Sequence, residues 1–198
     1  MTVWLVALAV LLIQPFQLPR SSGGTARMPH VILETEVGEI EIEVDTVRAP
    51  VTAANFLKYV DGGFYDGGRF HRTVKPDNQP DNAVKIEVIQ AGASAARVRE
   101  FFPPIPLEPT GTTGLTHADG VISMARTQPD SARDQFFICI GNQPELDFGG
   151  KRNADGQGFA AFGRVVRGMD VVRRIQAAPA RGQTLTPPVP IVRARRAS

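Results

Sequence analysis

Two short apolar runs, separated by a polar loop that contains a proline, constrain the fold of this chain most. They lie within residues 123–139, and neither run is long enough to form a helix. The segment is therefore predicted to form a strand, a loop and a second strand. Because side chains alternate along a strand, Gln135 and Phe137 share one face while Phe136 and Ile138 share the other. One face must belong to the core, and the other presents an aromatic ring beside an amide.

The rest of the chain is also dominated by predicted short strands. Residues 39–44 alternate glutamate with isoleucine or valine without exception, which predicts apolar side chains inward and glutamates in water. Together with residues 31–35 they are expected to form a hairpin. Further strands are predicted at 70–74, 85–90, 159–166 and 188–195, the last of these at an edge.

Only two segments have the periodicity of a helix. Pro50 suits the first turn of one helix, whose buried stripe runs from Ala53 to Val60. The second is short, spans about 169–175, and is closed by Pro179. Many short strands with two short helices predict a mainly β, antiparallel architecture, either a closed barrel or a sandwich. Periodicity alone leaves that choice open.

Three segments are predicted to be irregular. Residues 75–83 are rich in turn-forming residues and are expected to bury nothing. The prolines of residues 102–109 exclude a central strand or a helix interior, so this segment should follow the surface. Residues 148–158 are rich in glycine and predict another loop.

Composition narrows the class of protein. The chain has 198 residues, 42% hydrophobic and 21% charged, which is typical of one soluble globular domain with or without a leader. The net charge is only +2, and the basic cluster at 193–196 is a short tail, so no nucleic-acid partner is expected. A single cysteine, Cys139, excludes an internal disulfide, and the three isolated histidines argue against a metal site.

The N-terminal segment predicts a leader. Residues 4–13 form an unbroken apolar run, which has the length of a signal-peptide core and is short for a membrane span. Residues 14–28 are expected to be a disordered linker, and residues 29–198 to form the domain. No basic residue precedes the run and no clear Ala-x-Ala site follows it, so an uncleaved anchor and a misassigned start stay open. The expected location is periplasmic or extracellular, or cytoplasmic if the start is misassigned.

Four motifs in order carry a resemblance to a known family: Phe-His-Arg ending at Arg72, Ile-Gln-Ala-Gly containing Gln90, Ser-Met-Ala-Arg-Thr containing Ala125 and Arg126, and Gln-Phe-Phe-Ile-Cys containing Phe137. They resemble the cyclophilin-type peptidyl-prolyl isomerases, in a form that looks bacterial. The likeness extends from about residue 31 to the C-terminal strand. It implies a closed eight-stranded antiparallel barrel capped by two short helices. Its interior would be filled, so substrate would bind on the outer wall.

The resemblance also implies a reaction and a site. The protein would be a cofactor-free monomer that isomerises Xaa-Pro bonds in proline-containing polypeptides and assists their folding. Its membrane contact would be limited to an uncleaved anchor. The catalytic residues would be Arg72, Gln90 and Phe137. The residues expected to contact substrate are the apolar walls Val88, Leu146 and Phe159 and the groove residues Ala125, Arg126 and Gln135.

The chemistry of the bond explains why an arginine would suffice. Rotation about Xaa-Pro faces a barrier of roughly 18–20 kcal/mol because the peptide C–N bond has partial double-bond character. As the amide twists, conjugation is lost and the proline nitrogen becomes a hydrogen-bond acceptor. A fixed cationic donor aimed at that nitrogen stabilises the twisted state over both planar ones. Arg72 is the candidate donor, and Gln90 could hold it in place.

Two departures from the family pattern, at positions 87 and 145, motivate an alternative function. Glu87 and Glu145 stand where the family commonly has aromatic residues, and Phe159 where histidine or tyrosine is usual. Lost aromatic area would weaken substrate binding. The alternative is a proline-peptide binding or chaperone module with little or no turnover. Strict alternation also places Arg72 on the face opposite His71, which is therefore expected to be a hydrogen-bonded core residue.

Overall fold

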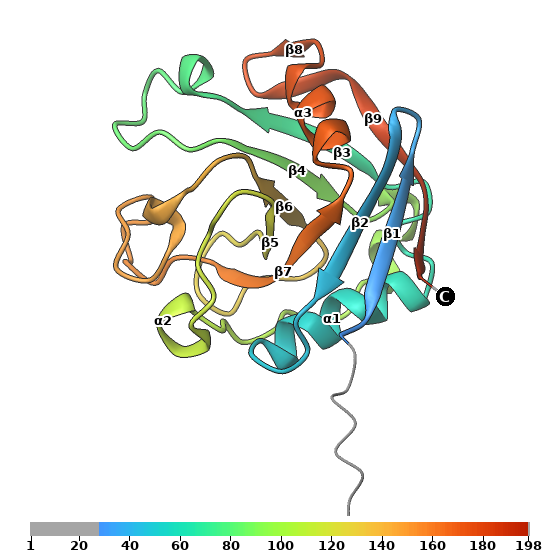
Figure 1. Ribbon diagram of the computed structural model, residues 1–198, viewed down its shortest axis with the longest axis horizontal. Coiled ribbons are helices and arrows are strands. Elements are labelled where there is room, and N and C mark those ends of the chain that lie inside the picture. The colour runs from blue at the N-terminus through green and yellow to red at the C-terminus, as the bar shows by residue number, and fades with distance from the viewer. Residues whose placement is uncertain (1–27, 198) are drawn as a thin grey trace, which may run out of the picture.

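A closed antiparallel barrel forms the body of the molecule (Figure 1). The computed structural model describes residues 28–197, so the predicted leader lies outside the described residues apart from Met28. Neighbouring strands follow the order β1-β2-β7-β5-β6-β4-β3-β9, and pairing of β1 with β9 closes the barrel. A two-residue strand, β8, adds to β9. The strands are β1 (His30–Thr35), β2 (Gly38–Val44), β3 (Arg69–Val74), β4 (Val88–Gly92), β5 (Val121–Met124), β6 (Phe136–Cys139), β7 (Ala160–Arg167), β8 (Ala180–Arg181) and β9 (Thr184–Arg196).

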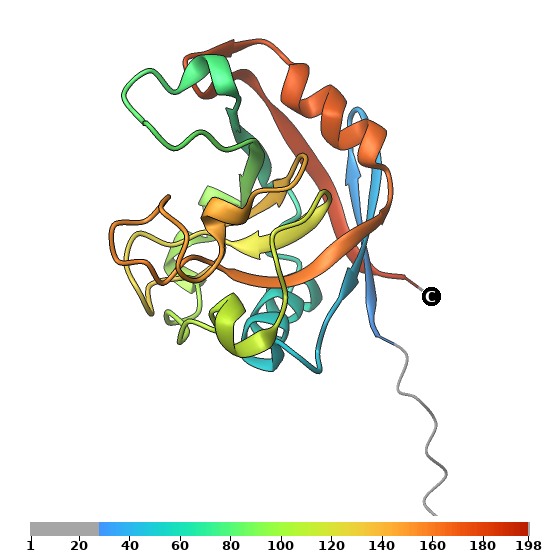
Figure 2. The same ribbon diagram turned by 60° about the vertical axis from the view of Figure 1, so that its left-hand side comes forward.

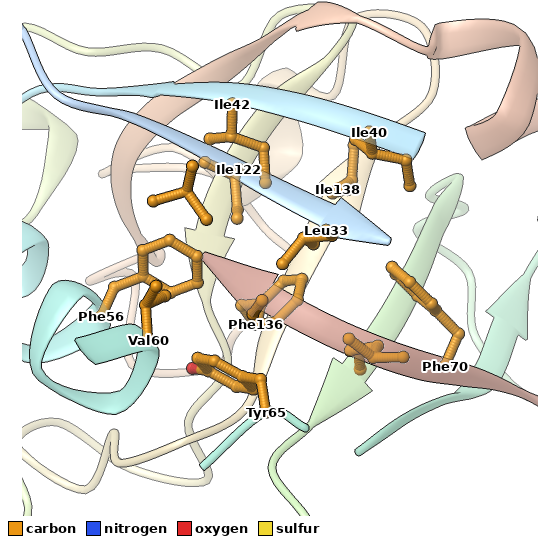
Figure 3. Packing of buried hydrophobic residues seen from close by; sticks show 14 of the residues in the cluster. Leu33, Ile40, Ile42, Phe56, Val60, Tyr65, Phe70, Ile122, Phe136 and Ile138 are labelled. Atoms are coloured by element: carbon orange, nitrogen blue, oxygen red, sulfur yellow. The ribbon is translucent and has the colours of Figure 1, made fainter. Parts of the chain in front are cut away.

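Side chains fill the barrel interior, as the close view in Figure 3 shows. Ile40 and Ile42 of β2 point inward and are fully buried, as the alternation of residues 39–44 predicted. On β6, Phe136 and Ile138 join the same interior cluster, while Phe137 belongs to a separate outer cluster. Because the interior is packed, a peptide can bind only on the outer wall.

Two helices cover the two ends of the barrel, α1 (Pro50–Asp61) at one and α3 (Met169–Ala177) at the other (Figure 2). Pro50 occupies the first turn of α1, and the ring of Phe56 packs against interior aromatic rings. A four-residue helix and three 3₁₀ turns complete the fold: α2 (Thr110–Thr113), η1 (Pro76–Asn78), η2 (Ala95–Glu100) and η3 (Pro144–Leu146). Within residues 28–197 no helix has the length and apolarity required to cross a bilayer.

Two predicted strands have different bounds in the structure. β4 begins at Val88 rather than at residue 85, because the main chain of Ile86 bonds to the Gln79 side chain instead of to a neighbouring strand. β9 runs from Thr184 to Arg196 and pairs with both β3 and β1. The prediction of an edge strand at 188–195 is therefore wrong, because closure of the barrel removes that edge.

The loop at 75–83 is also more ordered than predicted. Gln79 is only 2% exposed, and its amide donates to the carbonyls of Lys75 and Ile86 at 2.8 Å each. The expectation that this segment buries nothing is wrong. Turn-forming residues set the path of the loop, but one amide with several main-chain partners fixes its shape.

A β-bulge in β3 changes which side chains face outward. The pairing of β3 with β4 shifts between Phe70 and Arg72, so His71 is the extra residue. Phe70 lies in the interior, and Arg72 lies on the outer wall although strict alternation would turn it inward. His71 is half-buried and lines an outer hollow beside Asp134, so its prediction as a core residue on the opposite face from Arg72 is wrong.

Candidate functional site

A pocket of about 250 Å³ lies on the outer wall where β3, β4, β5 and β6 run side by side. Its lining includes eight of the nine residues predicted for the site: Arg72, Val88, Gln90, Ala125, Arg126, Phe137, Leu146 and Phe159. The ninth, Gln135, lines an adjoining hollow and accepts a hydrogen bond from Gln90 Nε2 at 2.7 Å. The four motifs, widely spaced in the sequence, thus meet in one place.

Strand register explains how three of these side chains come together. Arg72 on β3 pairs with Gln90 on β4, and Gln90 pairs in turn with Phe137 on β6. Residues directly opposite one another on adjacent strands point to the same face. The bulge at His71 is therefore essential, because without it Arg72 would leave this face.

The guanidinium of Arg72 is held by two amide oxygens. Nη1 donates to Gln90 Oε1 at 2.9 Å, while Nε and Nη2 donate to Gln183 Oε1 at 2.9 and 2.6 Å. Within residues 28–197 no carboxylate forms an ion pair with it. Burial lowers the pKa of Arg72 from its ordinary value, yet a guanidinium stays charged at neutral pH. The pocket thus holds a half-buried, fixed positive charge that is not neutralised.

Gln183 was missed by the sequence analysis. It lies in the turn between β8 and β9, 111 residues from Arg72, and no local pattern signals the contact. Its own amide donates to the main-chain carbonyl of Asn78 at 3.0 Å, so the 75–83 loop supports it. Gln183 is a positioning residue for Arg72.

On the isomerase activity that the resemblance implies, we expect Gln183→Ala to lower kcat/KM for an Xaa-Pro peptide by roughly three- to tenfold, because loss of a hydrogen bond worth about 1 kcal/mol frees one side of the guanidinium. The fall should lie in kcat more than in KM, since the peptide pocket is unchanged. Arg181→Ala, at the exposed last residue of β8 just before this turn, is the matched control. An unchanged kcat for Gln183→Ala would show that Gln90 alone fixes Arg72.

Phe137 forms the floor of the pocket and is supported from two sides. The His117 ring stacks on it with centroids 5.9 Å apart and planes 16° from parallel, and the Phe159 ring meets it edge-on at 5.2 Å. Nδ1 of His117 lies 2.7 Å from Asp147 Oδ1, and Nε2 lies 3.0 Å from Ser123 Oγ. In the sequence His117 is an isolated histidine, and no local pattern predicts these contacts.

Burial makes this histidine a source of pH dependence. Desolvation lowers the pKa of His117 from its usual value near 6.5, although the bond to Asp147 opposes that shift. Below about pH 6.5 the unfolded chain binds a proton that the folded chain excludes, so stability should fall as pH drops toward the folded-state pKa. Urea unfolding from pH 7.5 to 5 should show this fall, and His117→Asn should reduce it. His71, whose pKa burial also lowers, contributes in the same direction, whereas Asp134, whose pKa burial raises, contributes in the opposite direction.

The groove residues Ala125 and Arg126 differ in which of their hydrogen-bonding groups stay available to a substrate. The side chain of Arg126 forms a bidentate ion pair with Asp155 at 2.7 and 2.9 Å and donates to Gly158 O, so it belongs to the pocket wall. The same pair lowers the pKa of Asp155 to about 2. The N–H of Ala125 donates to Gln135 O at 2.9 Å, so it cannot also serve a peptide. Main-chain pairing with substrate would therefore use the Ala125 carbonyl and Arg126.

Neither glutamate that replaces a family aromatic lines the pocket. Glu87 accepts a hydrogen bond from the Gln176 side chain, and Glu145 accepts one from the main chain of Lys151. Ile86 and Arg152 do line the pocket, and neither was predicted to. Ile86 lies in a segment predicted as a strand, and Arg152 lies in a segment predicted as a loop. The direction in which their side chains point depends on tertiary contacts.

Comparison with known proteins decides the family. The model of the family described as cyclophilin type peptidyl-prolyl cis-trans isomerase/CLD matches residues 30–196. The chain belongs to the cyclophilin family. Its relatives include peptidyl-prolyl cis-trans isomerase A of Dickeya dadantii, 37% identical over 74% of this chain and 70% of the relative, and a peptidyl-prolyl cis-trans isomerase of Acinetobacter baylyi, 36% identical over 75% and 72%.

The fold agrees with this assignment. A crystal structure of a cyclophilin-type peptidyl-prolyl cis-trans isomerase from Cryptosporidium parvum has a TM-score of 0.69 at 19% identity and covers 86% of this chain and 98% of its own. The predicted cyclophilin barrel and the predicted activity class, a cyclophilin-type peptidyl-prolyl isomerase, are both confirmed. As in this family generally, the substrates are proline-containing peptides.

Proposed function

We propose that this cyclophilin assists protein folding by accelerating rotation of exposed Xaa-Pro bonds, and that Arg72 supplies the rate enhancement. The single observation that carries the proposal is the Arg72 guanidinium, which two amides fix beside an apolar floor and which has no carboxylate partner in the described part of the chain. A charge left unneutralised in a half-buried pocket costs stability, which is typical of a functional site.

The proposed roles follow from the geometry. The proline ring packs on Phe137, between the walls formed by Val88, Leu146 and Phe159. Arg72 then donates to the proline nitrogen as the amide twists, which favours the twisted state over both planar states. Gln90, bonded to both Arg72 and Gln135, keeps the donor aligned and faces the peptide main chain. No bond is broken, so the reaction needs no nucleophile and no cofactor.

The experiment is relaxation of a proline tetrapeptide from cis to trans, followed with and without the wild-type protein. We expect acceleration that is proportional to protein concentration. The alternative function is a proline-peptide binding or chaperone module, which is motivated by the absence of aromatic residues at positions 87 and 145. Peptide binding by calorimetry without any acceleration would favour that module and contradict the proposed activity.

The proposal also covers the oligomeric state, the partners and the location of the enzyme. We infer a monomer with no nucleic-acid partner, in which residues 1–28 direct export or anchor the domain 29–198 to a membrane. The apolar run at 4–13 supports this inference. N-terminal sequencing of the native protein after fractionation tests it. A mature protein that begins near residue 28 in the exported fraction is expected, whereas an intact N-terminus in the cytoplasm would contradict it.

A further inference from the structure

A second arginine lines the same pocket. Arg152 comes from the loop after η3, and the space it faces also contains Arg72, Ile86 and Leu146. Its Nη1 donates to Gln79 Oε1 at 2.9 Å and to the carbonyl of Val84 at 2.6 Å. Within residues 28–197 it forms no ion pair with a carboxylate, and no hydrogen bond engages its Nε or Nη2.

The position of Arg152 is fixed by buried structure. Gln79 is 2% exposed, and its amide also bonds to the main chains of Lys75 and Ile86. The Lys85 ammonium donates to the main-chain carbonyl of Gln79. The 75–83 loop is therefore folded around the amide that holds Arg152. The loop does not line the pocket itself, but it supports Arg152 through Gln79 and Gln183 through the carbonyl of Asn78.

The two arginines repel one another. Desolvation lowers the pKa of Arg152, and the positive charge of Arg72 lowers it further. Two like charges in one half-buried pocket, with no carboxylate among the described residues that line it, favour an anionic ligand. A carboxylate suits Arg152 best, because a guanidinium binds it through two parallel hydrogen bonds. Arg152 lines the pocket but not the adjoining hollow that contains Gln135. The anionic group would therefore lie at the end of the pocket away from Gln135.

We propose that Arg152 gives this cyclophilin a preference for proline segments in which an acidic side chain adjoins the proline. The inference rests on the proposed isomerase function and names its substrate class. In this chain, Arg152 lines the wall from which Glu145 is turned away. Arg152 adds a charge to a pocket whose apolar lining includes Ile86 and Leu146, so charge as well as apolar area sets the preference.

The test compares peptides with Glu, Gln or Lys immediately before or immediately after the proline, at pH 7 and low salt. We expect kcat/KM for Glu to exceed that for Gln by about three- to tenfold in at least one position, and Lys to rank below Gln. The advantage should shrink at 0.5 M NaCl. Arg152→Gln should bring the Glu/Gln ratio to about 1, and Arg152→Lys should retain part of it. Arg193→Gln, exposed on β9 and outside the pocket, should keep the wild-type ratio.

Two outcomes would overturn the inference while leaving the isomerase function intact. In the first, the wild type turns over the Gln peptides, and the Glu/Gln ratio of kcat/KM is near 1 at both positions. The other is a ratio that survives in Arg152→Gln. If no peptide is turned over, the proposed function fails first. The same ratios measured as affinities by calorimetry would then decide whether Arg152 selects acidic peptides.

Discussion

Replacing Arg72 with alanine is expected to lower kcat/KM for a proline tetrapeptide by roughly 10- to 100-fold. The guanidinium makes a charge-assisted hydrogen bond that forms fully only as the amide twists, and such bonds contribute about 1.5–3 kcal/mol. In the free protein, the Arg72 guanidinium bonds to the amides of Gln90 and Gln183, and to no other group within residues 28–197. The cis-to-trans relaxation assay with matched protein concentrations measures the change.

Arg72→Lys provides the control for charge alone. Lysine keeps the positive charge, but its single ammonium cannot bond to both amides and face the substrate in one geometry. We expect activity between that of the wild type and that of Arg72→Ala. Equal rates for wild type and Arg72→Ala, in protein shown to be folded by circular dichroism, would refute the role assigned to Arg72.

Two adjacent phenylalanines on β6 should respond to truncation in opposite ways. Phe136 is fully buried in the barrel interior, where its ring meets Phe56 and Tyr65 edge-on at 5.6 and 5.4 Å. Phe136→Ala should lower the free energy of unfolding by about 3–5 kcal/mol through lost burial and the cavity left behind. Urea denaturation measures this loss, and Phe136→Leu should cost less.

Phe137→Ala should cost less stability, because the space it leaves opens onto the pocket and water can enter it. Its main effect should be on the reaction: removal of the floor should lower kcat/KM by about tenfold or more through lost apolar contact with the proline ring. The opposite result would be that Phe137→Ala loses more unfolding free energy than Phe136→Ala, while folded Phe136→Ala has the lower kcat/KM. That result would mean that the two faces of β6 are assigned the wrong way round.

Local periodicity predicted the short strands but left a barrel or a sandwich open, and the likeness to a family predicted the closed barrel and most of the pocket. Alternation along β6 separated Phe136 from Phe137, and this separation is confirmed. Motif order placed Arg72, Gln90 and Phe137 together, and strand register does bring them to one face. Each of these predictions needed only the period of a strand and the likeness to a family.

What the sequence did not predict depends on contacts between distant segments. Gln183 bonds to Arg72 across 111 residues, and Gln79 bonds to Arg152 across 73. The bulge at His71 was missed as well, because an extra residue in one strand is defined only by its partner strand. Without the bulge, alternation would have directed Arg72 into the interior.

The most direct test of the account is the isomerisation rate of a peptide while it is bound to the protein, measured by NMR exchange spectroscopy with wild type and Arg72→Ala. If a fixed guanidinium stabilises the twisted amide, the bound rate should fall at least tenfold while peptide affinity changes much less. A variant that loses affinity but keeps the wild-type bound rate would contradict the account, because Arg72 would then hold the planar substrate and not the twisted state.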